Sequence, residues 1–133
     1  PSRLEGFGMP QVEANACGKP VIGIKAMAML DTLVHGETAF LADVATEVRI
    51  GETILGRESG FEEGHRVVFQ NFRTADYRAS VYDIADHLRR LMAEPDLRRR
   101  MGEAGRARVK AMYDYRVVAQ QFVQYVQEHL GIS

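Results

Sequence analysis

The sequence predicts an α/β fold with a few parallel strands, and two observations support this prediction. Two short apolar runs, Val21–Ile24 and residues 39–41, have the length and composition of strands buried in a parallel sheet. Segments with helical periodicity precede and follow these runs, and they are longest in residues 80–133.

The first 24 residues predict a glycine-flanked loop, a short helix and a buried strand. In the loop, Gly6 and Gly8 flank Phe7, and neither glycine has a Cβ that would keep a ligand away from the backbone N–H groups. Pro10 suits the first turn of a helix and Gly18 suits a left-handed exit, so a helix is predicted between them. Its N-terminus would direct free N–H groups and a partial positive charge at the loop, an arrangement that binds phosphate or sugar oxygens.

Two carboxylates flank this loop at a fixed spacing. Glu5 precedes the first glycine and Glu13 falls in the predicted helix, with seven residues between them. An ionised carboxylate accepts two neighbouring hydroxyl groups in charge-assisted hydrogen bonds. The pair therefore predicts a site for a hydroxyl-rich ligand, with Glu13 on a ribose and Glu5 on a hexose.

The string PSRLEGFGMPQVEANACGKPVI resembles the signature of the glycosyltransferase group 1 family, whose members are retaining enzymes with two facing Rossmann-like domains, the GT-B architecture. That signature is similar to P-S-x-x-E-G-F-G-x-P-x-x-E-A-x-A-x-G-x-P-V-I, with the same two glutamates. The resemblance implies that residues 1–133 are the C-terminal portion of the nucleotide-sugar-binding domain, a partial Rossmann-like domain.

The same resemblance assigns roles to individual residues. It implies that Glu5 is the catalytic-site residue facing the sugar and that Glu13 holds the ribose of the nucleotide. Lys25, directly after the first strand, is a candidate phosphate contact or, alternatively, a solvated side chain at the strand end. No metal or other cofactor is expected, because the resemblance implies that a helix terminus and basic groups stabilise the diphosphate of the nucleotide-sugar substrate. The residues expected around the sugar and phosphate oxygens are Gly6, Phe7, Gly8 and Met9.

The resemblance also implies that parts of the enzyme lie outside this chain. The first strands of the domain and a separate N-terminal domain, which binds the acceptor, would precede Pro1. That N-terminal domain is therefore the expected partner, and the isolated chain is expected to be inactive. Without it, the apolar face of a last helix over residues 117–130 would be exposed or would pair with a second copy.

Two stretches depart from the family pattern. In residues 25–31, Met27 and Ala28 stand where the family usually has two glycines, a change that bears on sugar specificity. Residues 43–79 are interpreted as an insertion made of a strand or short helix, a loop and a strand. The insertion would shape the acceptor side, make a subunit contact, or be a flap without function.

Residues 80–133 predict a helical C-terminal part. Ser80 is the expected N-cap of its first helix, with Asp83 three residues later as an incomplete capping box. Asp96, after Pro95, is expected to cap the second helix. The three predicted helices span residues 81–93, 97–113 and 117–130.

Composition excludes several classes of partner. The chain has 17 basic and 18 acidic residues, so it has no broad charge field for nucleic acid or an anionic membrane. Its single cysteine, Cys17, cannot form a disulfide within the chain and is expected to be buried against the sheet. No run of about 18 apolar residues is present, and the expected location is the cytoplasm.

The predicted function is that of a glycosyltransferase fragment, whose parent transfers a hexose from a nucleotide-diphosphate sugar to an acceptor with retention. A non-catalytic nucleotide-sugar-binding or assembly module is the alternative, and the changed loop and the insertion favour it. A glycogen-synthase-like or phosphorylase-like GT-B enzyme is a second alternative.

Overall fold

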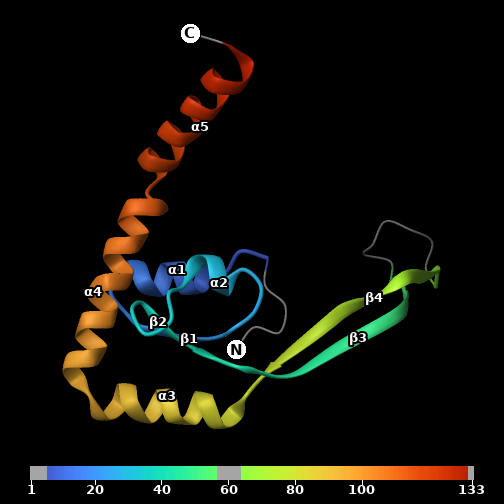
Figure 1. Cartoon of the computed structure of the whole chain (residues 1–133), viewed down its shortest axis with the longest axis horizontal. Coiled ribbons are helices and arrows are strands. Elements are labelled where there is room, and N and C mark those ends of the chain that lie inside the picture. Colours follow the sequence, from blue (N-terminus) through green and yellow to red (C-terminus); the bar gives the residue numbers. More distant parts are fainter. Residues whose placement is uncertain (1–5, 57–63, 132–133) are drawn as a thin grey trace.

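A computed structural model describes residues 6–56 and 64–131 of the chain, arranged as a small α/β body with two long projections (Figure 1). In chain order, the elements are α1 (Met9–Ala16), β1 (Val21–Ile24), α2 (Met29–Thr32), β2 (Ala39–Ala42), β3 (Val44–Ile54), β4 (Arg66–Ala79), α3 (Val81–Ala93), α4 (Pro95–Met112) and α5 (Tyr115–Leu130). The mixed α/β class predicted from the sequence is confirmed. None of the helices in the described ranges is long and apolar enough to cross a bilayer.

The body is built around the parallel pair β1–β2, which confirms both predicted strands. Val21 pairs with Ala39 at one end of the pair, and Ile24 pairs with Ala42 at the other. All four residues of β2 are buried, because helices cover both faces of this strand.

Side chains of β2 alternate between two hydrophobic clusters, as the pleat of a strand requires. Leu41 packs with Met29 of α2 on one face. Phe40 packs with Leu91 of α3 and Met101 of α4 on the other face. The core therefore joins the sheet to helices that come from both halves of the chain.

Helix α4 packs closely against α1 because glycine lies at the contact. A Cβ on Gly102 would lie 2.0 Å from the carbonyl oxygen of Gly18, and one on Gly105 would lie 2.6 Å from Oδ1 of Asn15. No larger side chain fits at either position unless the helices move apart. The two glycines thus fix the distance between α4 and the segment that follows the predicted ligand loop.

The C-terminal helices confirm most of the predicted boundaries. Ser80 Oγ accepts a hydrogen bond of 3.2 Å from the backbone N–H of Asp83, so the predicted N-cap of α3 is confirmed. The prediction that Asp96 caps the second helix is wrong. Helix α4 begins at Pro95, which suits a first helical position, and Asp96 lies in the first turn as the ion-pair partner of Arg99.

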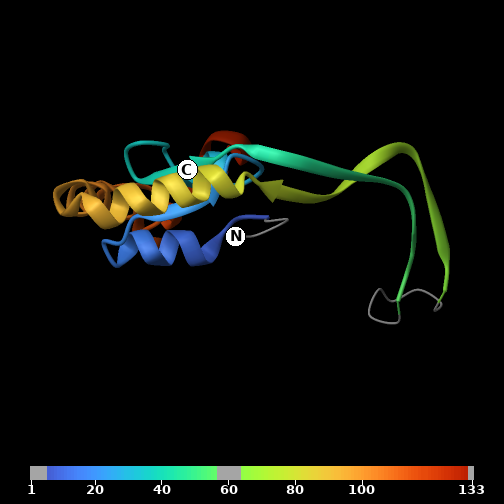
Figure 2. The same ribbon diagram turned by 90° about the horizontal axis from the view of Figure 1, so that it is seen from below.

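Strands β3 and β4 form a long antiparallel hairpin that projects from the body and bends along its length (Figure 2). Of the two alternatives for the first part of residues 43–79, the strand is present and the short helix is not, and the second predicted strand is confirmed. Residues 57–63 of the predicted loop lie outside the described residues. Hydrogen bonds to the Glu47 carboxylate hold its pKa below its ordinary value. The bond from Arg49 contributes most, and the bond from Thr74 contributes less. Ile54, Val68 and Phe72 are exposed on this hairpin.

Two predictions of burial have different outcomes. The prediction that Cys17 is buried is wrong, because it ends α1 as the C-cap and its side chain is exposed. The expected exposed face on the last helix is present, since α5 extends away from the body and buries none of its residues (Figure 1). Pairing of that face with a second copy stays a prediction.

The α1–α4 contact can be tested by adding one methyl group. Gly102→Ala should lower the free energy of unfolding by about 1–3 kcal/mol through overpacking, although alanine favours a helix interior over glycine by about 1 kcal/mol. Urea unfolding measures the change. The control, Glu103→Ala at the exposed neighbouring position, should stay within about 0.5 kcal/mol. A more stable Gly102→Ala variant would contradict the close contact.

Candidate functional site

The N-terminus of α1 is open toward the glycine loop. Gly8 is the N-cap and has φ 88° and ψ 53°, a left-handed conformation that glycine adopts without strain. No side chain of the described residues caps this end of the helix. The first helical hydrogen bond runs from Val12 N to Gly8 O at 3.4 Å, so the N–H groups of Met9 and Gln11 point toward the loop. Pro10 has no N–H to satisfy.

Gln11 is a site residue that the sequence reasoning missed. Its side chain is only 5% exposed and packs against Gly8, where a Cβ would lie 1.8 Å from Gln11 Nε2. The Nε2 group is buried and has no hydrogen-bond partner in the described part of the chain. A buried amide donor of this kind costs free energy unless something accepts its hydrogen bond. No motif in the sequence distinguishes Gln11 from an ordinary polar residue of a first helical turn.

The structure places five of the predicted site residues on the loop and α1. Met9 and Glu13 are exposed and lie four residues apart, so they share the outward face of α1. Glu5, the predicted catalytic-site residue, lies outside the described residues. That Glu5 and Glu13 face the same ligand therefore stays a prediction. The five residues are Gly6, Phe7, Gly8, Met9 and Glu13.

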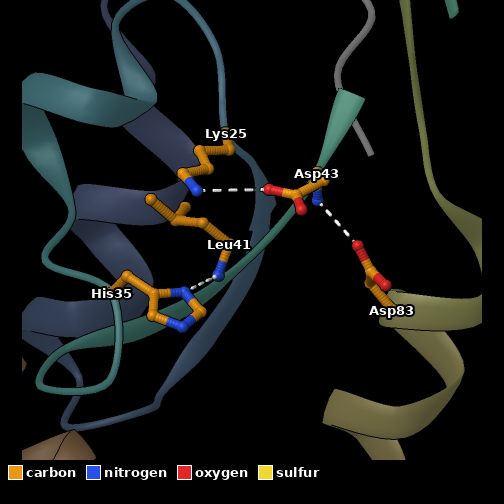
Figure 3. A network of polar contacts seen from close by, with 5 residues as sticks. All are labelled: Lys25, His35, Leu41, Asp43 and Asp83. Atoms are coloured by element: carbon orange, nitrogen blue, oxygen red, sulfur yellow. Dashed lines mark hydrogen bonds and ion pairs between the residues drawn. The ribbon is translucent and has the colours of Figure 1, made fainter. Parts of the chain in front are cut away.

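Lys25 belongs to a polar network at the carboxyl ends of the two parallel strands (Figure 3). Its Nζ lies 3.2 Å from Asp43 Oδ1, and both side chains are largely exposed. The backbone N–H of Asp43 donates to Asp83 Oδ2 at 2.9 Å, which ties β2 to the start of α3. An exposed pair of this kind is worth about 0–1 kcal/mol, so Lys25 can exchange Asp43 for another anion.

A hollow of about 270 Å³ adjoins this network, and His35 fixes one wall of it. His35 Nδ1 accepts a hydrogen bond of 2.9 Å from the backbone N–H of Leu41 (Figure 3). His87 stacks on Phe40, with ring centroids 4.7 Å apart. No short-range sequence pattern indicates this bond, because the partner of His35 lies on the next strand.

Comparison with known proteins agrees with this geometry. The family model described as "Glycosyl transferases group 1" matches residues 1–55, which include the loop, α1 and both parallel strands. Helices and strands overlay on sucrose-phosphate synthase from Thermosynechococcus elongatus with a TM-score of 0.61 over 96% of this chain and 23% of that one, at 24% identity. Residues 1–55 thus resemble the group 1 glycosyltransferases, and the fold of the chain is similar to that of sucrose-phosphate synthase, a protein of the GT-B fold.

Three proteins with similar sequences were found, two named as glycosyltransferases and one as a glucosaminyl malate synthase. N-acetyl-alpha-D-glucosaminyl L-malate synthase of Bacillus anthracis is 28% identical over 62% of this chain and 25% of its own length. A capsular polysaccharide biosynthesis glycosyltransferase, CapM, of Staphylococcus aureus is 27% identical over 89% and 22%. An uncharacterised glycosyltransferase of Methanocaldococcus jannaschii is 40% identical over 41% and 16%. The chain thus spans a quarter or less of each of these relatives.

The loop after β1 keeps a glycine-like backbone at Met27. Met27, which stands where the family usually has glycine, has φ 52° and is 42% exposed. A non-glycine residue in this left-handed region costs about 1–2 kcal/mol. The loop follows the carboxyl end of β1, the edge at which open α/β sheets bind ligands. The strained backbone therefore lies beside the candidate site.

Two glycine substitutions in this loop should have opposite effects. Met27→Gly should raise the free energy of unfolding by about 0.5–1 kcal/mol, because the relief of strain exceeds the entropy cost of glycine. Ala28→Gly, at a right-handed position with φ −57°, should lower it by about 0.5–1 kcal/mol. Urea unfolding of both variants measures the difference. Equal losses in both variants would contradict a strained Met27.

Proposed function

We propose that this chain supplies the nucleotide-sugar-binding part of a retaining glycosyltransferase, which transfers a hexose from a nucleotide-diphosphate sugar to an acceptor. The observation that carries the proposal is the uncapped N-terminus of α1 behind the left-handed Gly8. The match of residues 1–55 to group 1 glycosyltransferases supports it. The N-terminal domain of the parent chain would hold the acceptor.

In this proposal the diphosphate lies against the start of α1. The backbone N–H groups of Met9 and Gln11 point at the loop, and the helix dipole adds partial positive charge there. The unpartnered Nε2 of Gln11 supplies a further N–H group next to Gly8. These three groups satisfy anionic oxygens without a charged side chain.

The sugar and ribose hydroxyls are assigned to the two glutamates. Glu13 lies on the outward face of α1, where its carboxylate is free to accept two ribose hydroxyls. Glu5, assigned to the hexose, precedes the same loop in the sequence. Lys25 would contact a phosphate after leaving Asp43.

Transfer then breaks the bond between the anomeric carbon and the diphosphate oxygen, through an oxocarbenium-like state. Negative charge grows on the departing diphosphate, and the fixed N–H groups at the start of α1 stabilise it without reorganising. The acceptor oxygen attacks from the side that the diphosphate leaves, so configuration is retained, and its proton passes to the departing phosphate. No cofactor takes part in the proposed step.

The role of Glu13 can be tested on the full-length protein. Glu13→Ala should weaken binding of the nucleotide diphosphate by about 1.5–3 kcal/mol, which is the typical loss for a hydrogen bond to a charged group. Titration calorimetry with UDP, GDP and ADP measures this for whichever nucleotide binds. Glu37→Ala, at an exposed glutamate in the turn before β2, is the control and should bind as the unsubstituted protein does. Unchanged affinity in Glu13→Ala would refute the role.

Gln11 offers a second test in which stability and affinity separate. Gln11→Met keeps the shape of the side chain but removes the amide, so nucleotide affinity should fall by about 1 kcal/mol. The free energy of unfolding should not fall, because Nε2 has no partner within the described residues. Calorimetry and urea unfolding measure the two quantities. Loss of stability with unchanged affinity would assign Gln11 to folding alone.

A further inference from the structure

The glycine loop of the proposed site contacts the C-terminal end of α4 through an aromatic pair. Phe7 and Tyr113 have ring centroids 5.7 Å apart and an interplanar angle of 89°, an edge-to-face contact. Phe7 lies between Gly6 and Gly8 in the loop. Tyr113 is the C-cap of α4, and the next residue, Asp114, is the N-cap of α5.

The position of Tyr113 follows from the packing of α4. Gly102 and Tyr113 are about three helical turns apart, so they point to the same side of the helix. Residues along that side of α4 contact residues 7–18, and the two segments run in opposite directions. These contacts pair Gly102 with Gly18, Gly105 with Asn15, and Tyr113 with Phe7.

Gly8 of the loop packs against Gln11, but Gly6 has no close packing contact among the described residues. A Cβ added at Gly6 would meet no described atom within 4 Å, so Gly6 is in open space. Glycine loses more conformational freedom than any other residue when it is ordered. A ligand binds such a loop more weakly, because part of the binding free energy is used to order the loop. A contact that orders the loop before the ligand binds removes this loss. The Phe7 side chain, 46% exposed, is half covered and available for such a contact.

We propose that Tyr113 is a positioning residue of the nucleotide-sugar site. Its ring holds Phe7, and Phe7 holds the backbone N–H groups of the loop in the arrangement that the diphosphate needs. The contact uses the tyrosine ring and not its hydroxyl group. This inference rests on the proposed function of the loop, and it adds a residue about a hundred positions away in the sequence.

The test measures nucleotide affinity in the full-length protein with Tyr113→Ala, Tyr113→Phe, Phe7→Ala and the double variant Phe7→Ala/Tyr113→Ala. Titration calorimetry with UDP, GDP and ADP identifies the nucleotide that binds the unsubstituted protein, and that nucleotide is used throughout. Tyr113→Ala and Phe7→Ala should each raise the Kd about three- to tenfold, the range expected for an aromatic pair. Tyr113→Phe should stay within about twofold, because it retains the ring.

The double variant separates positioning from a general loss of structure. Its Kd should be no higher than that of the single variant that binds the nucleotide more weakly, because both substitutions remove the same contact. Tyr115→Ala is the matched control, since Tyr115 lies two residues away and is 72% exposed. It should bind as the unsubstituted protein does. Thermal unfolding verifies the fold of each variant, and Tyr113→Leu, with the same expected Kd, replaces Tyr113→Ala if the latter does not fold.

Amide hydrogen exchange provides a readout without ligand. The amide of Val12, which donates to the carbonyl of Gly8 at 3.4 Å, should exchange faster in Tyr113→Ala than in Tyr115→Ala. Normal nucleotide affinity in Tyr113→Ala, or losses that add in the double variant, would overturn this inference and leave the proposed function intact. Failure of the unsubstituted protein to bind any of the three nucleotides would reject the proposed function, and this inference with it.

Discussion

The close approach of α4 to the segment around α1 is the constraint on which the arrangement of the site depends. The backbone of α4 comes so near to Gly18 that no Cβ fits on Gly102. Such an approach requires glycine on a helix whose interior would otherwise favour alanine. The loss in helix propensity is offset by a fixed relation between the C-terminal helices and the first residues of the domain.

The site itself is made mainly from backbone. Gly8 turns the chain so that α1 begins with its N–H groups directed at the loop, and Gln11 fills the space that a Cβ on Gly8 would have taken. Backbone donors at a helix terminus keep their orientation because the whole helix supports them. The α/β core behind them is small, and helix α4 supplies Met101 to it as well as contacting α1.

Local patterns were enough to predict the two parallel strands, α1 and the boundaries of α3, since short apolar runs and capping residues act within a few positions. The roles of the loop residues rest instead on the resemblance to the family signature, and they stay predictions. The exposure of Cys17, the bond from Leu41 to His35 and the contact of Phe7 with Tyr113 depend instead on how distant elements pack. Asp96 shows the same limit, because Pro95 began the helix earlier than an aspartate cap would have.

The β3–β4 hairpin leaves the body and returns to it at a single neck. Val44 pairs with Ala79, and the backbone N–H of Ser80 donates to the carbonyl of Asp43 at 2.8 Å, so the chain enters and exits side by side. Strands beyond this neck pair with each other, as the register from Val44 to Ile54 shows. Evolution can therefore lengthen or shorten this arm beyond the neck while the start of α3, and every element after it, keeps its place.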